Sequence, residues 1–194
     1  MEGATIRIQI VIFTCLFLFA CSGPNEMDLK KILAKQSCPN CDLRGAGLIK
    51  ADLTGINLAG ANLKMANLRE ADLSNVNLKG ANLYRANLNG ANLSRANLNG
   101  ANLHRANLFN ADLNETDLKG AKLSGAHMFG SSLNKADLTN ADLSQTNLTG
   151  TILKETIFCN NIAGDGIQTI VLEKIMAGQA KELGIEVNDA CKPR

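Results

Sequence analysis

Residues 81–108 read ANLYRANLNGANLSRANLNGANLHRANL, and this stretch decides the fold. The tripeptide Ala-Asn-Leu recurs every five residues, and the same register continues in both directions without an insertion. From Leu43 to Phe158 there are 24 positions in steps of five, and all hold leucine except Met128 and Phe158. Two residues before each stands a short side chain, Ala in 16 cases and otherwise Thr, Ser, Cys, Ile or Val. Internal repetition of this regularity predicts a repeat architecture.

A period of five fits neither an α-helix nor a flat strand. Successive leucines would move by ~140° around a helix, so no face of that helix would become apolar. In a flat strand they would alternate between the two faces of the sheet. The spacing fits a short extended step followed by a corner, in which the short residue and the leucine both point inward. The two positions after each leucine turn the chain, and they are rich in turn-favouring Gly, Asn and Ser.

This pattern resembles that of the pentapeptide-repeat proteins over roughly residues 38–160. The resemblance implies an all-β solenoid, a right-handed quadrilateral β-helix with four pentapeptides in each coil. Twenty-four pentapeptides then make six coils of 20 residues. Residues i and i+20 are expected to stack on neighbouring coils, so that Asn62, Asn82 and Asn102 align as a ladder. The stability of such a rod comes from stacking its coils.

Residues 1–20 have the pattern of a signal peptide. Arg7 precedes an apolar run from Ile8 to Ala20, which has the length of a signal h-region and is too short to span a bilayer. The run ends in Leu-Phe-Ala-Cys, similar to the lipobox of bacterial lipoproteins, which implies that Cys21 becomes a lipidated first residue. An uncleaved anchor and a plain signal peptide cut nearby are the alternatives. We predict a lipid-anchored, extracytoplasmic protein of the cell envelope, tethered through residues 22–26.

Two helices are expected to cover the ends of the rod, where exposed strand edges would invite aggregation. Asn25 is a suitable N-cap for a helix over Glu26–Gln36, with Leu29, Ile32 and Leu33 on one face. A second helix is predicted over 166–183, to cap the last coil or to pair with a second copy in a homodimer. The predicted segments are 1–20 (signal peptide), 21–37 (lipidated Cys21, tether and helix), 38–160 (repeats) and 161–194 (capping helix and tail).

Four of the six cysteines remain after Cys15 and Cys21 are set aside with the signal and the lipid: Cys38, Cys41, Cys159 and Cys191. An even number in an exported protein suggests disulfides, and a Cys159–Cys191 bond would tie the end of the chain to the last coil. Cys38 and Cys41 form a CxxC motif. A redox site would need this motif at the start of a helix in a βαβ unit. Because both positions fall in the inward register, we interpret them as core or disulfide residues.

The sequence offers no convincing catalytic, metal-binding or cofactor-binding site. Asp52 and Asp72 stack one coil apart, a spacing that would suit a carboxylate pair, but Asp and Asn alternate freely at this position. His104 and His127 are isolated outward residues. A structural zinc would need two more thiolates or imidazoles near the CxxC motif. We therefore predict a protein that is not an enzyme and holds no cofactor.

Outward residues should form rows along the rod. Arg95, Glu115, Lys135 and Glu155 are spaced by 20 and predict an alternating-charge ladder. A second set of stacked pairs places aromatic side chains beside arginines, as protein interfaces often do. Ordinary stacking along the solenoid is the alternative for these pairs. This candidate interaction patch consists of Tyr84, Arg85, His104, Arg105, Phe109 and Phe129.

The favoured function is a rigid, membrane-anchored scaffold that binds an unidentified protein partner. The alternative is DNA mimicry, since some members of the family bind DNA gyrase. Duplex DNA carries one negative charge per about 1.7 Å, whereas residues 42–158 contain 12 Lys and Arg against 10 Asp and Glu. That near-neutral balance and the export signal both oppose DNA mimicry, and we expect no nucleic-acid partner. A CxxC oxidoreductase is the third hypothesis.

Overall fold

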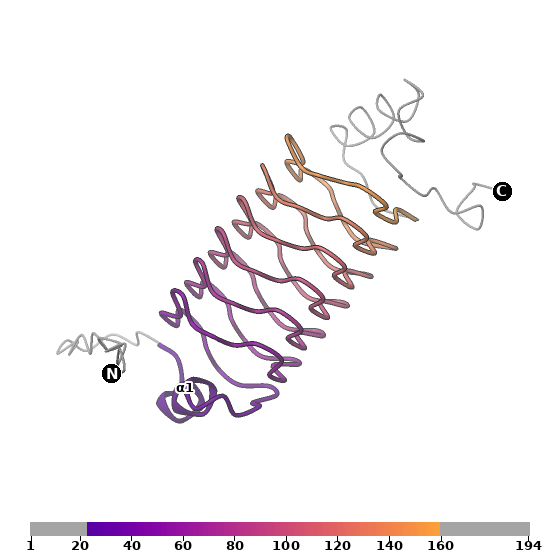
Figure 1. Ribbon diagram of the computed structural model, residues 1–194. Coiled ribbons are helices and arrows are strands. Elements are labelled where there is room, and N and C mark those ends of the chain that lie inside the picture. Colours follow the sequence, from indigo (N-terminus) through magenta and orange to yellow (C-terminus); the bar gives the residue numbers. More distant parts are fainter. Residues whose placement is uncertain (1–22, 160–194) are drawn as a thin grey trace, which may run out of the picture.

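The computed structural model describes residues 23–159, which form a straight rod of stacked coils with one helix at its first end (Figure 1). The chain turns every five residues and returns to the same place after 20. Each outward central residue bridges in parallel to the residue 20 positions later, in an unbroken series from Asp42↔Asn62 to Asp137↔Ile157. Four turns and a 20-residue repeat give each coil four faces and four corners, as predicted.

Every corner is a β-turn with the same backbone. At the corner after Leu83, for example, Ala86 N donates to Leu83 O at 2.9 Å, and Arg85 between them has a φ of 54°. A positive φ at the third residue of a turn favours glycine or asparagine. Ten of these 24 turn positions, from Asn40 to Glu155, hold glycine, and the others include Arg, Glu and Lys. The repeat therefore places residues with long charged side chains in the left-handed backbone conformation.

Each coil is joined to the next by backbone hydrogen bonds that run along the rod. Leu88 N donates to Asn107 O at 2.7 Å, Asn107 N donates to Ala86 O at 2.9 Å, and the corner also contributes Gly90 N to Phe109 O at 2.9 Å. This arrangement satisfies the backbone groups of residues that belong to no long strand. Each face of the rod is therefore a series of isolated parallel β-bridges and contains no long strand within residues 23–159.

The interior is a continuous column of leucines and short side chains. Leucines from Leu43 to Leu148 are at most 1% exposed, and the alanines two residues before them are equally buried wherever they lie in the middle coils. Where threonine replaces alanine, its hydroxyl is satisfied inside: Thr116 Oγ1 donates to Leu93 O at 3.1 Å and Thr156 Oγ1 donates to Leu133 O at 2.7 Å. The core thus accepts substitutions without changing its register.

Helix α1 (Glu26–Leu33) covers the first coil, with the Asn25 side chain accepting from Met27 N and Asp28 N as the predicted N-cap. The helix ends three residues earlier than predicted. Lys35 adopts a φ of 54°, Gln36 N donates to Lys31 O and Lys35 N donates to Ile32 O. This pair of bonds is the Schellman motif, which stops a helix.

The expected apolar face of α1 is only partly buried against the first coil. Ile32 is fully buried and Leu29 packs against the core, but Leu33 is 39% exposed. Within residues 23–159, no helix is long and apolar enough to cross a membrane. The signal peptide, Cys21, the helix over 166–183 with its dimer role, and Cys191 lie outside the described residues, so these remain predictions.

Candidate functional site

The six residues of the predicted patch lie along both edges of one face of the rod. Tyr84, Arg85, His104 and Arg105 belong to one corner, and Phe109 and Phe129 belong to the next corner along the chain. Between the two corners run the bridged residues Asn87, Asn107 and His127. We call these nine residues the docking face. Three extended residues separate the corners, which corresponds to about 10 Å.

The aromatic side chains of the first corner are stacked on one another. The Tyr84 and His104 ring centroids are 5.6 Å apart with an interplanar angle of 23°. Lys64, one coil before Tyr84, places its Nζ 5.5 Å from the same ring, and the Arg85 guanidinium lies 5.3 Å from it. His104 Nδ1 is 2.7 Å from Ser124 Oγ on the following coil. Lys64 and His104 thus cover Tyr84 from either side along the rod.

The second corner of the docking face is apolar and exposed. Phe109 and Phe129 stack with centroids 5.6 Å apart and planes 12° apart, yet they remain 38% and 45% exposed. They line a shallow groove of about 470 Å³, together with Asn89, Asn107, His127 and Asn147. Large exposed apolar side chains beside polar ones are typical of a binding surface.

The floor of the docking face offers hydrogen-bond donors. Asn87 Oδ1 accepts from Asn89 N and Asn107 Oδ1 accepts from Phe109 N, both at 3.2 Å. On the next face along the chain, by contrast, Asn92 Nδ2 donates along the rod to Asp72 Oδ1 at 3.2 Å. Within the part of the chain that the structure describes, the Nδ2 groups of Asn87 and Asn107 donate to no protein atom. Sequence reasoning missed these two donors, because their residues look identical to the other asparagines of the repeat.

A basic corner overlaps one edge of the docking face. The strips 62–67, 82–87, 102–107 and 122–127 run around this corner on four successive coils. They contain four basic residues, Lys64, Arg85, Arg105 and Lys122, and no acidic residue. None of the four forms an ion pair within residues 23–159. The near-neutral total charge of the protein does not reveal this local excess of cations, and sequence reasoning missed the corner for that reason.

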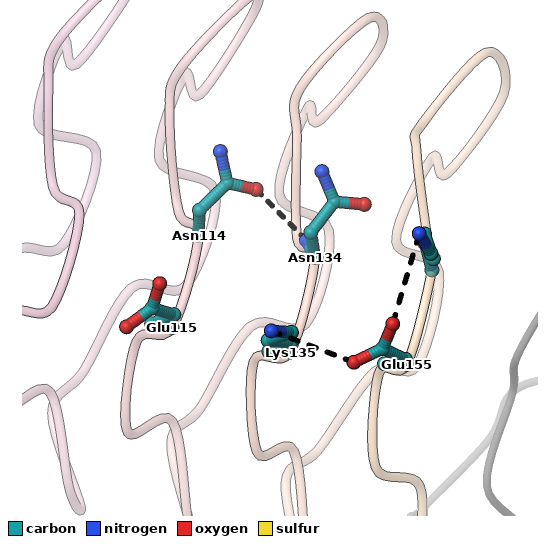
Figure 2. Close-up of a pocket in the computed structure, with 6 residues that line it drawn as sticks. Asn114, Glu115, Asn134, Lys135 and Glu155 are labelled. Carbon is teal, nitrogen blue, oxygen red and sulfur yellow. Dashed lines mark hydrogen bonds and ion pairs between the residues drawn. The ribbon is translucent and has the colours of Figure 1, made fainter.

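The corner half a coil away has the opposite character. Its strips, 72–77, 92–97, 112–117 and 132–137, hold five acidic and two basic residues, and we call it the acidic corner. Arg95 Nε lies 3.0 Å from Glu115 Oε2. Lys135 Nζ lies 3.6 Å from Glu155 Oε2, and Figure 2 shows this second pair. The guanidinium of Arg95 lowers the pKa of Glu115. The predicted charge ladder is present as these two pairs.

The residues drawn in Figure 2 line a hollow at the acidic corner. The volume of this hollow is about 310 Å³. Asn114 Oδ1 accepts from Asn134 N at 2.9 Å and from Ser132 Oγ at 2.6 Å. The charged side chains around the hollow include both signs: Lys135 and Lys154 pair with Glu155, and Glu115 pairs with Arg95. This hollow therefore presents little uncompensated charge to a ligand.

Asp52 and Asp72 do not form a catalytic pair. Asp52 forms a salt bridge with Lys35 just beyond α1, and the hydrogen bond from Lys35 lowers the pKa of Asp52 to about 2. Asp72 Oδ1 instead accepts from Asn92 Nδ2 at 3.2 Å. A general acid near neutral pH requires a raised carboxyl pKa, and Asp52 shows the opposite shift. The interaction with Lys35 ties the end of the helix to the rod.

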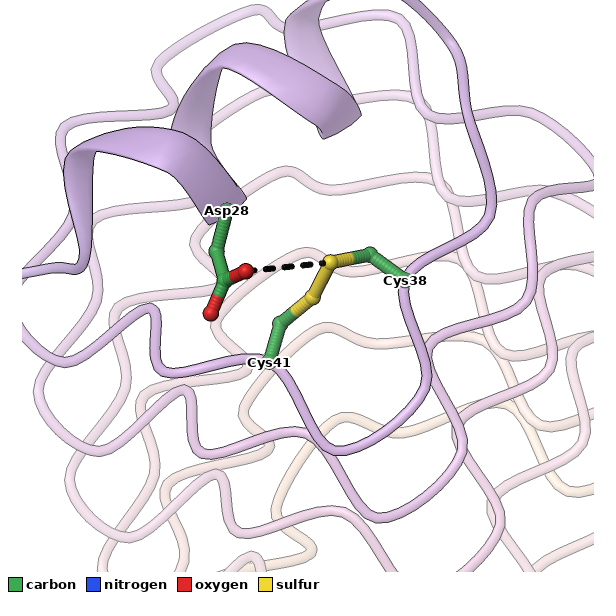
Figure 3. A group of neighbouring side chains, drawn as sticks. All are labelled: Asp28, Cys38 and Cys41. Atoms are coloured by element: carbon green, nitrogen blue, oxygen red, sulfur yellow. Dashed lines mark hydrogen bonds between the residues drawn. A yellow bond between two sulfur atoms is a disulfide. The ribbon is translucent and has the colours of Figure 1, made fainter.

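Cys38 and Cys41 form a disulfide under α1 (Figure 3). Cys38 is 4% exposed and Cys41 is 3% exposed. Asp28 Oδ1 lies 3.7 Å from Cys38 Sγ, and Asp28 Oδ2 accepts from Asp42 N at 3.0 Å. These three side chains are close enough to hold a metal ion, but sulfurs joined in a disulfide provide no thiolate ligands. Cys159 is also disulfide-bonded.

Comparison with known families gives a match to the pentapeptide repeats, in segments 33–64, 51–90, 86–125 and 121–160. Together these segments span residues 33–160, from the last residue of α1 through all the coils. No curated protein sequence matches the chain.

Several solved structures are similar to this chain. HetL, a pentapeptide repeat protein involved in heterocyst differentiation regulation from the cyanobacterium Nostoc sp. strain PCC 7120, is 36% identical over 63% of this chain and 69% of its own, with a TM-score of 0.40. Rfr23 from the cyanobacterium Cyanothece 51142 is 27% identical over 71% of this chain and 98% of its own, with a TM-score of 0.35. QnrB1, a plasmid-mediated fluoroquinolone resistance protein, is 17% identical over 74% of this chain and 86% of its own, with a TM-score of 0.45.

Proposed function

The chain belongs to the pentapeptide-repeat family, and from this premise we propose that it is a non-enzymatic scaffold that binds a partner protein through the docking face. The observation that carries the proposal is the exposure of Phe109 and Phe129 beside Arg85 and Arg105 on a rigid surface. Aromatic and arginine side chains supply most of the binding energy in many protein interfaces. The repeat itself requires none of these four side chains, because its register depends on the inward positions.

The proposal includes attachment to the bacterial cell envelope through a lipidated Cys21. It also includes the right-handed winding of the rod and a second capping helix over 166–183. Support for the anchor comes from the h-region and the lipobox-like Leu-Phe-Ala-Cys at 18–21. DNA mimicry is less well supported, because the basic corner presents four cations where a mimic of DNA needs anions.

The anchor is tested by the intact mass of the protein from the membrane fraction, compared with a Cys21→Ala variant. We expect a mature chain that begins at an acylated Cys21, with the variant leaving the membrane fraction. A soluble chain that still carries residues 1–20 would overturn the proposed location.

The scaffold role is tested separately, by placing a photo-crosslinking amino acid at position 109 in the intact cell. Position 79 serves as the control, since Lys79 is an exposed first turn residue on the diagonally opposite corner. We expect a discrete crosslinked protein from position 109 and none from position 79. Equal labelling from both positions would contradict a specific docking face.

A further inference from the structure

We propose that the docking face and the basic corner recognise an extended, acidic segment of the partner protein that also carries an apolar side chain. This inference rests on the proposed scaffold function and names the chemistry of the partner. It follows from a combination of cations, free amide donors and an apolar groove on one side of the rod.

The first argument is the absence of a counterion. Arg85 and Arg105 occupy the same corner position on successive coils, about 4.8 Å apart at the backbone. Elsewhere this position alternates in sign, as in Arg95 beside Glu115 and Lys50 beside Glu70. Two stacked arginines repel each other, and no acidic side chain within residues 23–159 pairs with either of them. A carboxylate from a partner would relieve this repulsion and accept hydrogen bonds from both guanidinium groups.

The second argument concerns hydrogen-bond polarity. Arg85 and Arg105 can only donate, and the side-chain amides of Asn87 and Asn107 use their oxygens on backbone N–H groups of their own coil. The face therefore offers mainly donors to an incoming chain. Backbone carbonyls and carboxylates are the acceptors that an extended acidic peptide brings.

The third argument is the apolar corner about 10 Å from the arginines. An extended chain rises about 3.3 Å per residue, so three residues cross the face from Arg105 to Phe109. A carboxylate at one end of such a tripeptide then reaches the arginines, while an apolar side chain at the other end reaches the groove between Phe109 and Phe129. The segment that fits has an acidic and an apolar residue two positions apart, because residues at that spacing in an extended chain point to the same side.

Nucleic acid fits this surface less well. Single strands bind through bases that stack on open aromatic faces, but Lys64 and His104 occupy the two sides of Tyr84 along the rod. Affinity for a phosphate backbone also grows with the number of phosphates that a protein neutralises, and this corner supplies only four cations.

The test is fluorescence anisotropy on the full chain, purified in mild detergent, with three labelled probes. They are a 12-residue peptide of Glu, Ser and Leu with Glu and Leu two positions apart, the same peptide with Gln for Glu, and a 12-nucleotide oligothymidine. We expect the Glu peptide to bind at least tenfold more tightly than the other two, and its affinity to fall as salt rises.

The double variant Arg85→Gln/Arg105→Gln should weaken binding of the Glu peptide at least tenfold. Its matched control is Arg95→Gln, which alters the same turn position on the acidic corner and should change binding less than twofold. Phe109→Ser/Phe129→Ser should weaken the Glu peptide while leaving a Leu-free version of that peptide unaffected. Circular dichroism of each variant verifies folding.

Three results would overturn the inference. The first is equal binding of the Glu and Gln peptides, and the second is tighter binding of the oligonucleotide. The third is self-association of the chain that the Arg85→Gln/Arg105→Gln variant abolishes, which would identify a second copy as the occupant. Crosslinking from position 109 without peptide binding would leave the scaffold in place and remove only the acidic partner. Peptide binding without crosslinking would keep the preference for an acidic segment and remove the scaffold role in the cell.

Discussion

The basic corner and the acidic corner have one backbone and opposite surfaces. Arg85 and Arg95 both follow a leucine and a polar residue, with φ values of 54° and 58°, and the leucines beneath them are fully buried. Outside, Arg95 pairs with Glu115, whereas Arg85 meets a second arginine on the next coil. Because the coil is the same, the difference between the corners reflects the outward side chains alone. The scaffold therefore separates stability, which lies inside, from recognition, which lies outside.

The largest expected effect is a loss of stability that is equal at the two corners, because the interior beneath them is the same. Leu83→Ala beneath the basic corner and Leu93→Ala beneath the acidic corner should each lower the free energy of unfolding by about 2–5 kcal/mol, because each leaves a cavity in a fully packed column. Urea denaturation of both variants measures this. A much larger loss at one corner would mean that the core, and not only the surface, differs between them.

A smaller effect is expected from relieving the left-handed backbone. Arg85→Gly should raise the free energy of unfolding by about 0.5–1 kcal/mol, because glycine adopts a positive φ without steric cost and this gain exceeds its added entropy in the unfolded chain. Arg95→Gly should gain less, since it also removes the interaction with Glu115. Denaturation under identical conditions compares the two, and equal gains would show that the Arg95–Glu115 pair contributes no more than the contact of Arg85 with the Tyr84 ring.

The fold could be predicted from the sequence because one physical requirement repeats 24 times. Every inward leucine from Leu43 to Leu148 is buried as the register predicts. The early end of α1 was not predicted, since the backbone bonds around Lys35 that stop it have no signature in side-chain hydrophobicity. A glycine at position 35 would have signalled this stop.

The docking face was only partly predictable for a different reason. The stacked aromatic pairs follow directly from a spacing of 20, and the structure contains both of them. The basic corner emerges only when the chain is read in strips across coils, because its charge cancels against the acidic corner in the total of +2. The free amides of Asn87 and Asn107 depend on side-chain orientation, which the repeat does not specify.

The charge reversal Arg105→Glu would convert the basic corner into a copy of its opposite. The new glutamate would lie one coil from Arg85, as Glu115 lies one coil from Arg95, and glutamate already occupies this turn position at Glu115 and Glu155 with a positive φ. We expect binding of the acidic peptide to fall by more than tenfold while stability rises slightly, because exposed pairs contribute at most about 1 kcal/mol. Anisotropy and urea denaturation on one preparation measure both, and retained binding would contradict the role of the arginine pair.

The smallest expected difference between the corners is their response to acid. Arg95 lowers the pKa of Glu115 below its ordinary value of 4.5, through a side-chain hydrogen bond first and charge second. A carboxylate with a depressed pKa stabilises the folded state fully above the unfolded pKa, and this contribution is lost as pH falls through the folded value. Below about pH 4.5, Arg95→Gln should therefore lose less stability than the parent protein does. Arg85→Gln should follow the parent curve, because no carboxylate within residues 23–159 pairs with Arg85.

Nuclear magnetic resonance titration of the Glu115 carboxyl carbon measures the cause directly. The pKa of Glu115 should rise in Arg95→Gln and stay constant in Arg85→Gln. If Arg85→Gln also reduced the loss of stability at low pH, Arg85 would already pair with a carboxylate of its own chain. It would then not be available to bind an acidic segment of a partner.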